Sequence, residues 1–89
     1  MAGMDNTQFV KVDNASAGEV SDVLRRVYEA MEEKGYSPVN QIVGYIMSGD
    51  PTYITSHNNA RSIIRRVERD EIVEELLDFY IENKAWKKD

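Results

Sequence analysis

Residues 34–51, with the sequence KGYSPVNQIVGYIMSGDP, decide the fold, because helix-ending and helix-starting residues stand on both sides of a short apolar segment. Lys34-Gly35 is typical of a helix end, since glycine readily adopts the left-handed conformation that terminates a helix. Ser37-Pro38 favours a new start, with serine as the N-cap and proline in the first turn. These signals predict one helix that ends at Lys34 and another over residues 38–48.

The second half of this stretch repeats the same pair of signals. Ser48-Gly49 predicts the end of the second helix, and Asp50-Pro51 predicts a single helical turn near Pro51. Gly44 stands in the middle of the second helix, where glycine costs about 0.5–1 kcal/mol relative to alanine. We therefore expect another part of the backbone to pack closely against Gly44.

Apolar residues recur at three- and four-residue spacing on both sides of the stretch, which is the pattern of helices with one buried face. The predicted main helices span residues 18–34, 38–48, 57–68 and 71–83. Asp70 is expected to cap the last of them. One strand-like segment near the N-terminus has no partner, so the sequence predicts an all-α fold. We expect a compact small domain of four main helices plus a one-turn helix over 18–84, between a mobile tail at 1–17 and a frayed C-terminus at 85–89.

The short chain also predicts self-association. A chain of 89 residues forms one domain with a modest core. The segments 39–47 and 76–80 carry more large apolar residues than a small monomer covers. We expect a homodimer whose interface uses both segments. The expected interface residues are Ile42, Gly44, Tyr45, Leu76 and Tyr80.

The sequence offers no set of catalytic or metal-binding residues. It has no cysteine and one histidine, His57, so a serine or threonine nucleophile has only one imidazole available as its base. The glycines form neither a dinucleotide fingerprint nor a phosphate loop. We expect a protein that is not an enzyme and that holds no cofactor and no metal. Its apolar runs are far shorter than the ~20 residues that cross a bilayer, and it lacks a secretory signal, so we expect a cytoplasmic protein without membrane insertion.

The sharpest local feature is a basic segment within an acidic chain. The net charge is −5, yet residues 57–69 contain four arginines and one acid. Arg61, Arg65 and Arg69 follow i, i+4, i+8 spacing, so on a continuous helix they form a row along one face. Arg66 lies about 100° further round that helix.

Two interpretations of this row are open: a solvated face paired with nearby acids, and a docking surface for carboxylate or phosphate groups. Arginine suits the second role because its planar guanidinium holds such groups with two parallel hydrogen bonds. We expect Arg61, Arg65, Arg66 and Arg69 to bind a protein partner. A small nucleic-acid-binding module that uses the arginine-rich helix is the alternative. The net negative charge opposes it, and we expect no nucleic-acid partner.

Several stretches of the chain together resemble one family. They read DNTQF at 5–9, EEKGYSPVNQIVGY at 32–45, SGDPTYI at 48–54, NARSIIRRVERDE at 59–71 and EELL at 74–77. Over roughly residues 5–82 the chain resembles the IreB family of regulatory phosphoproteins of low-GC Gram-positive bacteria. The chain departs from the family pattern at Thr55-Ser56, where members often carry a proline and a basic residue.

The resemblance implies a small helical homodimer that is phosphorylated by a membrane-anchored Ser/Thr kinase with extracellular PASTA repeats. A cognate phosphatase reverses the modification. The family's phosphorylated threonine lies in the tail, and Thr7 matches it. The unphosphorylated form is implied to promote Clp-dependent proteolysis of the enolpyruvyl transferase that starts peptidoglycan synthesis. The resemblance therefore implies a regulator of cell-wall synthesis and of tolerance to cell-wall antibiotics.

Overall fold

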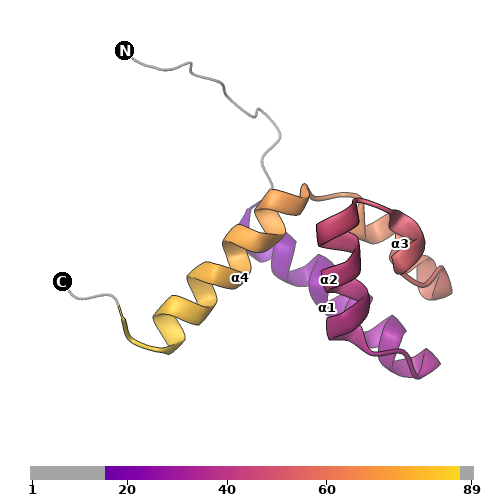
Figure 1. Cartoon of the computed structure of the whole chain (residues 1–89), viewed down its shortest axis with the longest axis horizontal. Coiled ribbons are helices and arrows are strands. Elements are labelled where there is room, and N and C mark those ends of the chain that lie inside the picture. Colours follow the sequence, from indigo (N-terminus) through magenta and orange to yellow (C-terminus); the bar gives the residue numbers. More distant parts are fainter. Residues whose placement is uncertain (1–15, 87–89) are drawn as a thin grey trace, which may run out of the picture.

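The structure, a computed structural model, describes residues 16–86, and this part of the chain contains helices and no strand (Figure 1). In chain order the elements are α1 (Ala17–Lys34), α2 (Pro38–Ser48), η1 (Pro51–Tyr53), η2 (His57–Asn59), α3 (Ala60–Ile64) and α4 (Arg69–Asn83). The predicted all-α fold is confirmed. The helix end at Lys34, the helix over 38–48 and the turn at Pro51 are also confirmed.

The residues at the helix starts and ends act as their types suggest. Ser16 and Ser37 cap α1 and α2, and each side-chain oxygen accepts a hydrogen bond from the backbone N–H three residues on, at 3.1 and 3.4 Å. Gly35 and Gly49 end these helices with φ angles of 77° and 76°. These two positions require glycine, because a Cβ is disfavoured in the left-handed region.

The third helix is much shorter than predicted, and the expectation of one helix over 57–68 is wrong. Asn58 and Asn59 have φ angles of 52° and 63°, so α3 begins only at Ala60. Asparagine tolerates this left-handed conformation better than most residues. The helix ends at Ile64, and the chain then turns so that Val67 is buried, with 4% of its surface exposed. The helix therefore stops after Ile64, and the turn that follows, not a continued helix, brings Val67 into the core.

The last helix also starts earlier than predicted. Its N-cap is Glu68, and Oε1 of Glu71 accepts a hydrogen bond from the backbone N–H of Glu68 at 2.7 Å. Asp70 is therefore inside the first turn of α4, and the expectation that it caps the helix is wrong. An acidic residue in a first turn still favours the positive end of the helix.

The core forms around α1, which contacts α2, α3 and α4. Its buried apolar residues are Val20, Val23, Val27, Ala30, Met31, Tyr45, Ile54, Ala60, Ile63, Ile64, Val67 and Ile72. Ile72, in the first turn of α4, is the last of the described residues in this core. The rest of α4 projects from the body of the protein (Figure 1). Most of the length of α4 is therefore available for contacts outside the core of one chain.

Gly44 has a close neighbour, but the neighbour is not another backbone. A Cβ at Gly44 would lie 2.5 Å from Cδ1 of Tyr53, whose ring packs on this point of α2 from η1. The prediction of close packing is confirmed, while its expected partner is wrong. The ring of Tyr53 in the same chain accounts for glycine at this position.

Candidate protein-interaction site

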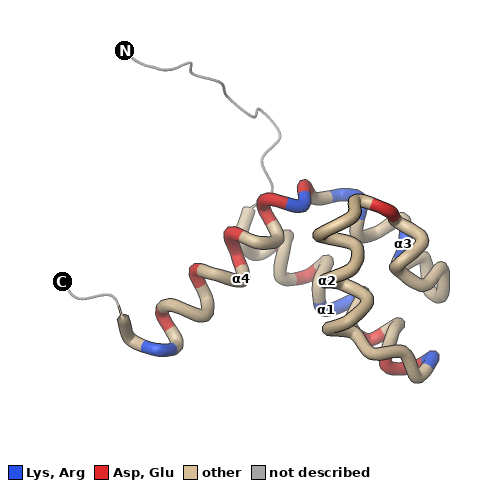
Figure 2. Tube along the Cα trace, viewed as in Figure 1, with Lys and Arg blue, Asp and Glu red and all other residues tan. Residues whose placement is uncertain are grey.

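The four arginines of the basic segment do not form a single row. Because α3 ends at Ile64, Arg65 and Arg66 lie in the turn that follows, and Arg69 begins α4. Figure 2 shows basic positions on α3 and on the connection from α3 to α4, with acidic residues spaced along α4. The predicted continuous row along one helix face is therefore wrong.

Two of these arginines bind the backbone of their own chain. Nε of Arg61 donates a hydrogen bond to the carbonyl oxygen of Ile54 at 2.8 Å, and Nη1 of Arg69 donates to that of Ile46 at 2.9 Å. The side chains of Arg65 and Arg66 are exposed and make no hydrogen bond or ion pair with residues 16–86. The structure thus divides the basic segment into two arginines with structural bonds and two whose guanidinium groups face solvent.

Arg69 closes the C-terminal end of α2. Its guanidinium lies so close to Gly49 that a Cβ there would be 2.9 Å from Cζ. Ile46, whose carbonyl accepts the hydrogen bond, is in the last turn of α2. A positive charge at this end of a helix is favourable, because the last carbonyl groups carry partial negative charge. Arg69 therefore joins the first turn of α4 to the last turn of α2.

Arg61 organises the loop between η1 and η2. The carbonyl it binds belongs to Ile54, whose side chain is fully buried. Asp50, at the start of η1, accepts hydrogen bonds from the backbone N–H and the hydroxyl of Thr52 at 3.0 and 2.7 Å. These bonds lower the pKa of Asp50, and the charge of Arg61 lowers it further. Arg61 and Asp50 therefore influence each other electrostatically.

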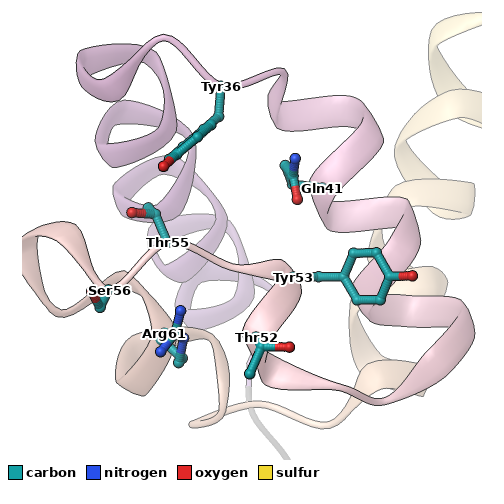
Figure 3. A pocket seen from close by; sticks show the side chains of 7 residues that line it. All are labelled: Tyr36, Gln41, Thr52, Tyr53, Thr55, Ser56 and Arg61. Carbon is teal, nitrogen blue, oxygen red and sulfur yellow. The ribbon is translucent and has the colours of Figure 1, made fainter.

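A polar pocket of about 280 Å³ lies beside Arg61 (Figure 3). It is bordered by the α1–α2 connection, by α2 and by the loop from η1 to α3. The residues that line it are Tyr36, Gln41, Thr52, Tyr53, Thr55, Ser56 and Arg61. The sequence did not predict this pocket, because its hydroxyl groups come from loop residues that no periodicity connects.

An apolar groove of about 270 Å³ lies between α1, α2 and α4. The residues that line it are Leu24, Tyr28, Pro38, Val39, Ile42, Val43, Ile46 and Leu76. Some of these large apolar side chains are unusually exposed, with 71% for Val39 and 50% for Val43. A contiguous exposed apolar surface of this kind is typical of a protein–protein interface.

The structure brings together only part of the predicted dimer interface. Ile42 and Leu76 both line the apolar groove. Tyr45 is 6% exposed and belongs to the core of the single chain, while Gly44 faces the ring of Tyr53. Tyr80 is half exposed near the end of α4, where its ring makes an edge contact with Trp86.

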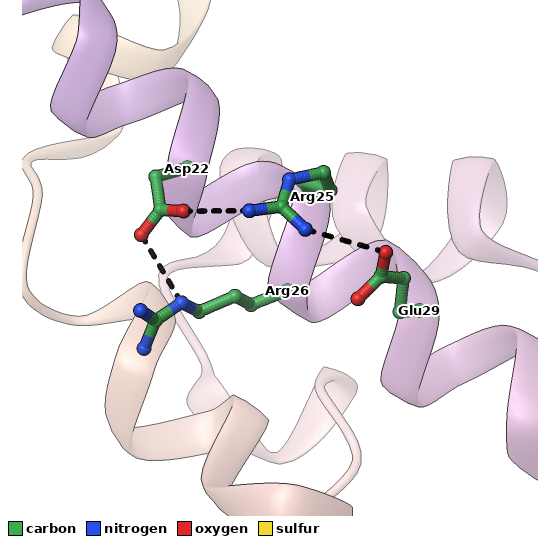
Figure 4. A network of polar contacts seen from close by, with 4 residues as sticks. All are labelled: Asp22, Arg25, Arg26 and Glu29. Atoms are coloured by element: carbon green, nitrogen blue, oxygen red, sulfur yellow. Dashed lines mark hydrogen bonds and ion pairs between the residues drawn. The ribbon is translucent and has the colours of Figure 1, made fainter.

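Helix α1 contributes groove residues that the sequence analysis missed. Leu24 and Tyr28 are four residues apart and so share one face of α1. Elsewhere on α1, Asp22 pairs with Arg25 and Arg26 at 3.0 and 3.1 Å (Figure 4). The second guanidinium nitrogen of Arg25 pairs with Glu29 at 3.4 Å. Exposed pairs of this kind each contribute at most about 1 kcal/mol, so this part of α1 is a solvated surface.

Other kinds of site are not present in the described part of the chain. No helix within residues 16–86 is long and apolar enough to cross a membrane. Over the same residues, no group of three or more histidine, aspartate or glutamate side chains could hold a metal ion. The predicted phosphosite Thr7 and the predicted tail at 1–17, apart from its last two residues, lie outside the described residues.

Comparison with known proteins places these features in a family. The model of the family described as IreB regulatory phosphoprotein matches residues 5–82. A UPF0297 protein of Ruminiclostridium cellulolyticum is 58% identical over 81 residues, which cover 91% of this chain and 92% of the relative. A UPF0297 protein of Lachnoclostridium phytofermentans is 61% identical over 83 residues, which cover 93% and 94% of the two chains.

Proposed function

This chain belongs to the IreB family of regulatory phosphoproteins, and we propose that it is a non-enzymatic regulator controlled by phosphorylation of Thr7. A PASTA-type Ser/Thr kinase adds the phosphate in the cytoplasm, and a cognate phosphatase removes it. The protein controls peptidoglycan synthesis, and with it tolerance to cell-wall antibiotics, through protein–protein contacts. In its unphosphorylated form it promotes Clp-dependent proteolysis of the enolpyruvyl transferase.

The observation that carries this proposal is the pair of exposed arginines at the α3–α4 turn. In a chain of net charge −5, Arg65 and Arg66 present two guanidinium groups with no partner in residues 16–86. A guanidinium can hold a partner's carboxylate through two parallel hydrogen bonds. We propose that Arg65 and Arg66 contact the partner directly, while Arg61 and Arg69 support the surface around them through their bonds to the backbone.

The apolar groove supports the proposed homodimer. Leu76 lines the groove, and Leu77 and Phe79, one and three residues further along α4, are 55% and 66% exposed. Residues 16–86 of one chain leave these side chains uncovered, because α4 projects from the core after its first turn. A second copy of the chain supplies an identical groove and an identical helix, so each α4 can cover the groove of the other. This arrangement is self-complementary, as a two-fold dimer requires.

Affinity capture tests the proposed switch. The unmodified chain and the chain phosphorylated at Thr7 are each immobilised and exposed to a cell lysate. We expect the unmodified chain to retain components of the Clp protease or the enolpyruvyl transferase, and the phosphorylated chain to retain much less of them. Equal retention by both forms would contradict the proposed role of Thr7.

A further inference from the structure

The polar pocket beside Arg61 has an unusual composition for a surface hollow. Each of its seven lining side chains carries a polar group, and five of these groups are hydroxyls. Arg61 is the only one of the seven that is charged at neutral pH. In Figure 3 Arg61 and Thr52 lie at the lower side of the pocket and Tyr36 and Gln41 above them, while the ring of Tyr53 points away from the other labelled side chains. A space lined by one cation and many hydrogen-bond donors suits an anion with several acceptor oxygens.

Arg61 keeps donors for such a ligand. Its Nε is bound to the carbonyl of Ile54, which fixes the plane of the guanidinium group. Its two terminal nitrogens make no hydrogen bond or ion pair with residues 16–86. The hydroxyls of Tyr36 and Ser56 also have no hydrogen-bond partner in this part of the chain. The pocket therefore contains a fixed cation and several donors whose bonds are not satisfied by the described residues.

Asp50 is the nearby group that opposes an anion. Its charge interacts with that of Arg61, but the two side chains make no direct ion pair within the described residues. The carboxylate is instead bound by the N–H and the hydroxyl of Thr52. Arg61 therefore remains able to form direct charged hydrogen bonds. A phosphate monoester suits it, because it carries about −1.5 to −2 charges and three strong acceptor oxygens.

We infer that this pocket receives the phosphorylated side chain of Thr7 from the same chain, an inference that rests on the proposed function. Ser16, where α1 is capped, is nine positions after Thr7 in the sequence, and an extended segment of nine steps spans about 30 Å. Helix α1 has 18 residues and is about 27 Å long. Tyr36, one wall of the pocket, follows the far end of α1 by two residues. A tail extended along α1 therefore just reaches the pocket.

Intramolecular docking explains how one phosphate can change a whole surface. The short tether gives the phosphate an effective concentration in the millimolar range, so modest intrinsic affinity is sufficient. The docked tail covers part of the surface beside α1 and α3. Without phosphate, the tail has no anionic group of this strength at Thr7, and the pocket remains open to solvent. The two forms of the protein thus present different surfaces to a partner.

The test uses the full chain with phosphothreonine placed at position 7 by chemical ligation, and compares its ¹H–¹⁵N NMR spectrum with that of the unmodified chain. We expect the shift changes to concentrate on the backbone amides of Thr55 and Ser56 and on the Nε–H of Arg61, and to persist on dilution. Changes confined to Arg65 and Arg66, or no changes at the pocket, would overturn the inference. Changes that disappear on dilution would place the phosphate on another copy and also overturn it.

Variants separate docking from loss of structure. Arg61→Gln should weaken docking by about tenfold or more, since a charged hydrogen bond is lost, whereas the matched change Arg65→Gln should leave docking intact. Ser56→Ala and Tyr36→Phe each remove one hydroxyl and should reduce the docked fraction without changing the fold. Asp50→Asn should increase it, because a competing negative charge is removed. Unchanged docking in all four pocket variants would overturn the assignment of the site.

Titration with free phosphate distinguishes the phosphorylated Thr7 side chain from a free anion as the ligand of the pocket. Inorganic phosphate added to the unmodified chain should shift the same amides only at about millimolar concentration, comparable to what the tether supplies. Saturation far below this would identify a free anion as the ligand and overturn the tail as the occupant. Because the phosphate on Thr7 is installed chemically, failure of a kinase to label Thr7 would contradict the proposed function and leave this result unaffected.

Discussion

Arg69 occupies the space that a side chain at Gly49 would need, with its Cζ 2.9 Å from the position of a Cβ there. In this place its Nη1 reaches the carbonyl of Ile46 and joins α4 to the end of α2. Gly49 is therefore required twice, once for its φ angle of 76° and once for this contact. The α2–α4 junction depends on both residues.

Gly49→Ala is predicted to destabilise the protein more than Gly35→Ala does. Both glycines end a helix with nearly equal positive φ, so each change costs about 1–2 kcal/mol of backbone strain. A Cβ at Gly35 meets nothing within 4 Å, whereas at Gly49 it displaces Arg69. Loss of the charged hydrogen bond adds roughly 1–3 kcal/mol at Gly49. Urea unfolding of both variants measures the difference, and equal losses would show that the Arg69 contact contributes nothing.

Gly44→Ala is predicted to lower stability although alanine is the better helix former. The new methyl group would lie 2.5 Å from the ring of Tyr53, and such overpacking typically costs 1–3 kcal/mol. In a Tyr53→Ala background the same change should become stabilising by about 0.5–1 kcal/mol, because only the helix propensity remains. Thermal melts of the four chains of this cycle test the reversal of sign. A loss of stability in both backgrounds would mean that another neighbour excludes the methyl group.

The fold follows closely from the sequence where a start or stop signal is local. Ser37, Gly35 and Gly49 act through their own side chain or φ angle, so each could be predicted without knowledge of the rest of the fold. The third helix could not be predicted in this way. Its apolar spacing continues to Val67, but the turn after Ile64 is decided by how Val67 fits into the core.

The candidate site also could be predicted from the sequence only in part. Counting arginines identified the basic segment, yet the roles of Arg61 and Arg69 depend on the carbonyls of Ile54 and Ile46, which are 7 and 23 residues away in the sequence. The spacing of side chains along one helix contains no information about such partners. The division of the arginines into bonded and unbonded pairs therefore required the three-dimensional structure.

This division predicts opposite behaviour for Arg65 and Arg69. Arg65→Ala should change stability by no more than about 0.5 kcal/mol, because the side chain is exposed and unbonded within the described residues. Its effect on partner capture should be larger, on the order of 1–3 kcal/mol, if the partner receives a charged hydrogen bond from it. Arg69→Ala should lower the melting temperature, because it removes the hydrogen bond to the carbonyl of Ile46. Unchanged capture by Arg65→Ala and Arg66→Ala alike would identify the exposed pair as a solvated surface.

The apolar groove predicts that a single charge at Leu76 disrupts the homodimer. Light scattering at micromolar concentration should give about twice the chain mass of 10.2 kDa for the natural sequence. Leu76→Glu should give the monomer mass, because a carboxylate would be buried in an apolar groove without a partner. Asp78→Asn, at an exposed position of the same helix, is the control and should leave the mass unchanged. A monomeric natural sequence would contradict the proposed dimer.

Thr7 is predicted to be the residue that the kinase modifies. The chain has other exposed hydroxyls, such as those of Thr52 and Ser56, but the hydroxyl of Thr52 is already bound to Asp50 at 2.7 Å. Ser56 lies in a loop whose shape depends on the bond between Arg61 and Ile54, and a kinase binds its substrate as an extended segment.

We expect mass spectrometry after kinase treatment to find one phosphate at Thr7 and none on Thr7→Ala. Thr7→Ser should restore labelling, because a Ser/Thr kinase accepts either hydroxyl, and Ser56→Ala should leave it unchanged. Full labelling of Thr7→Ala would assign the regulatory phosphate to a different hydroxyl and would contradict the proposed function.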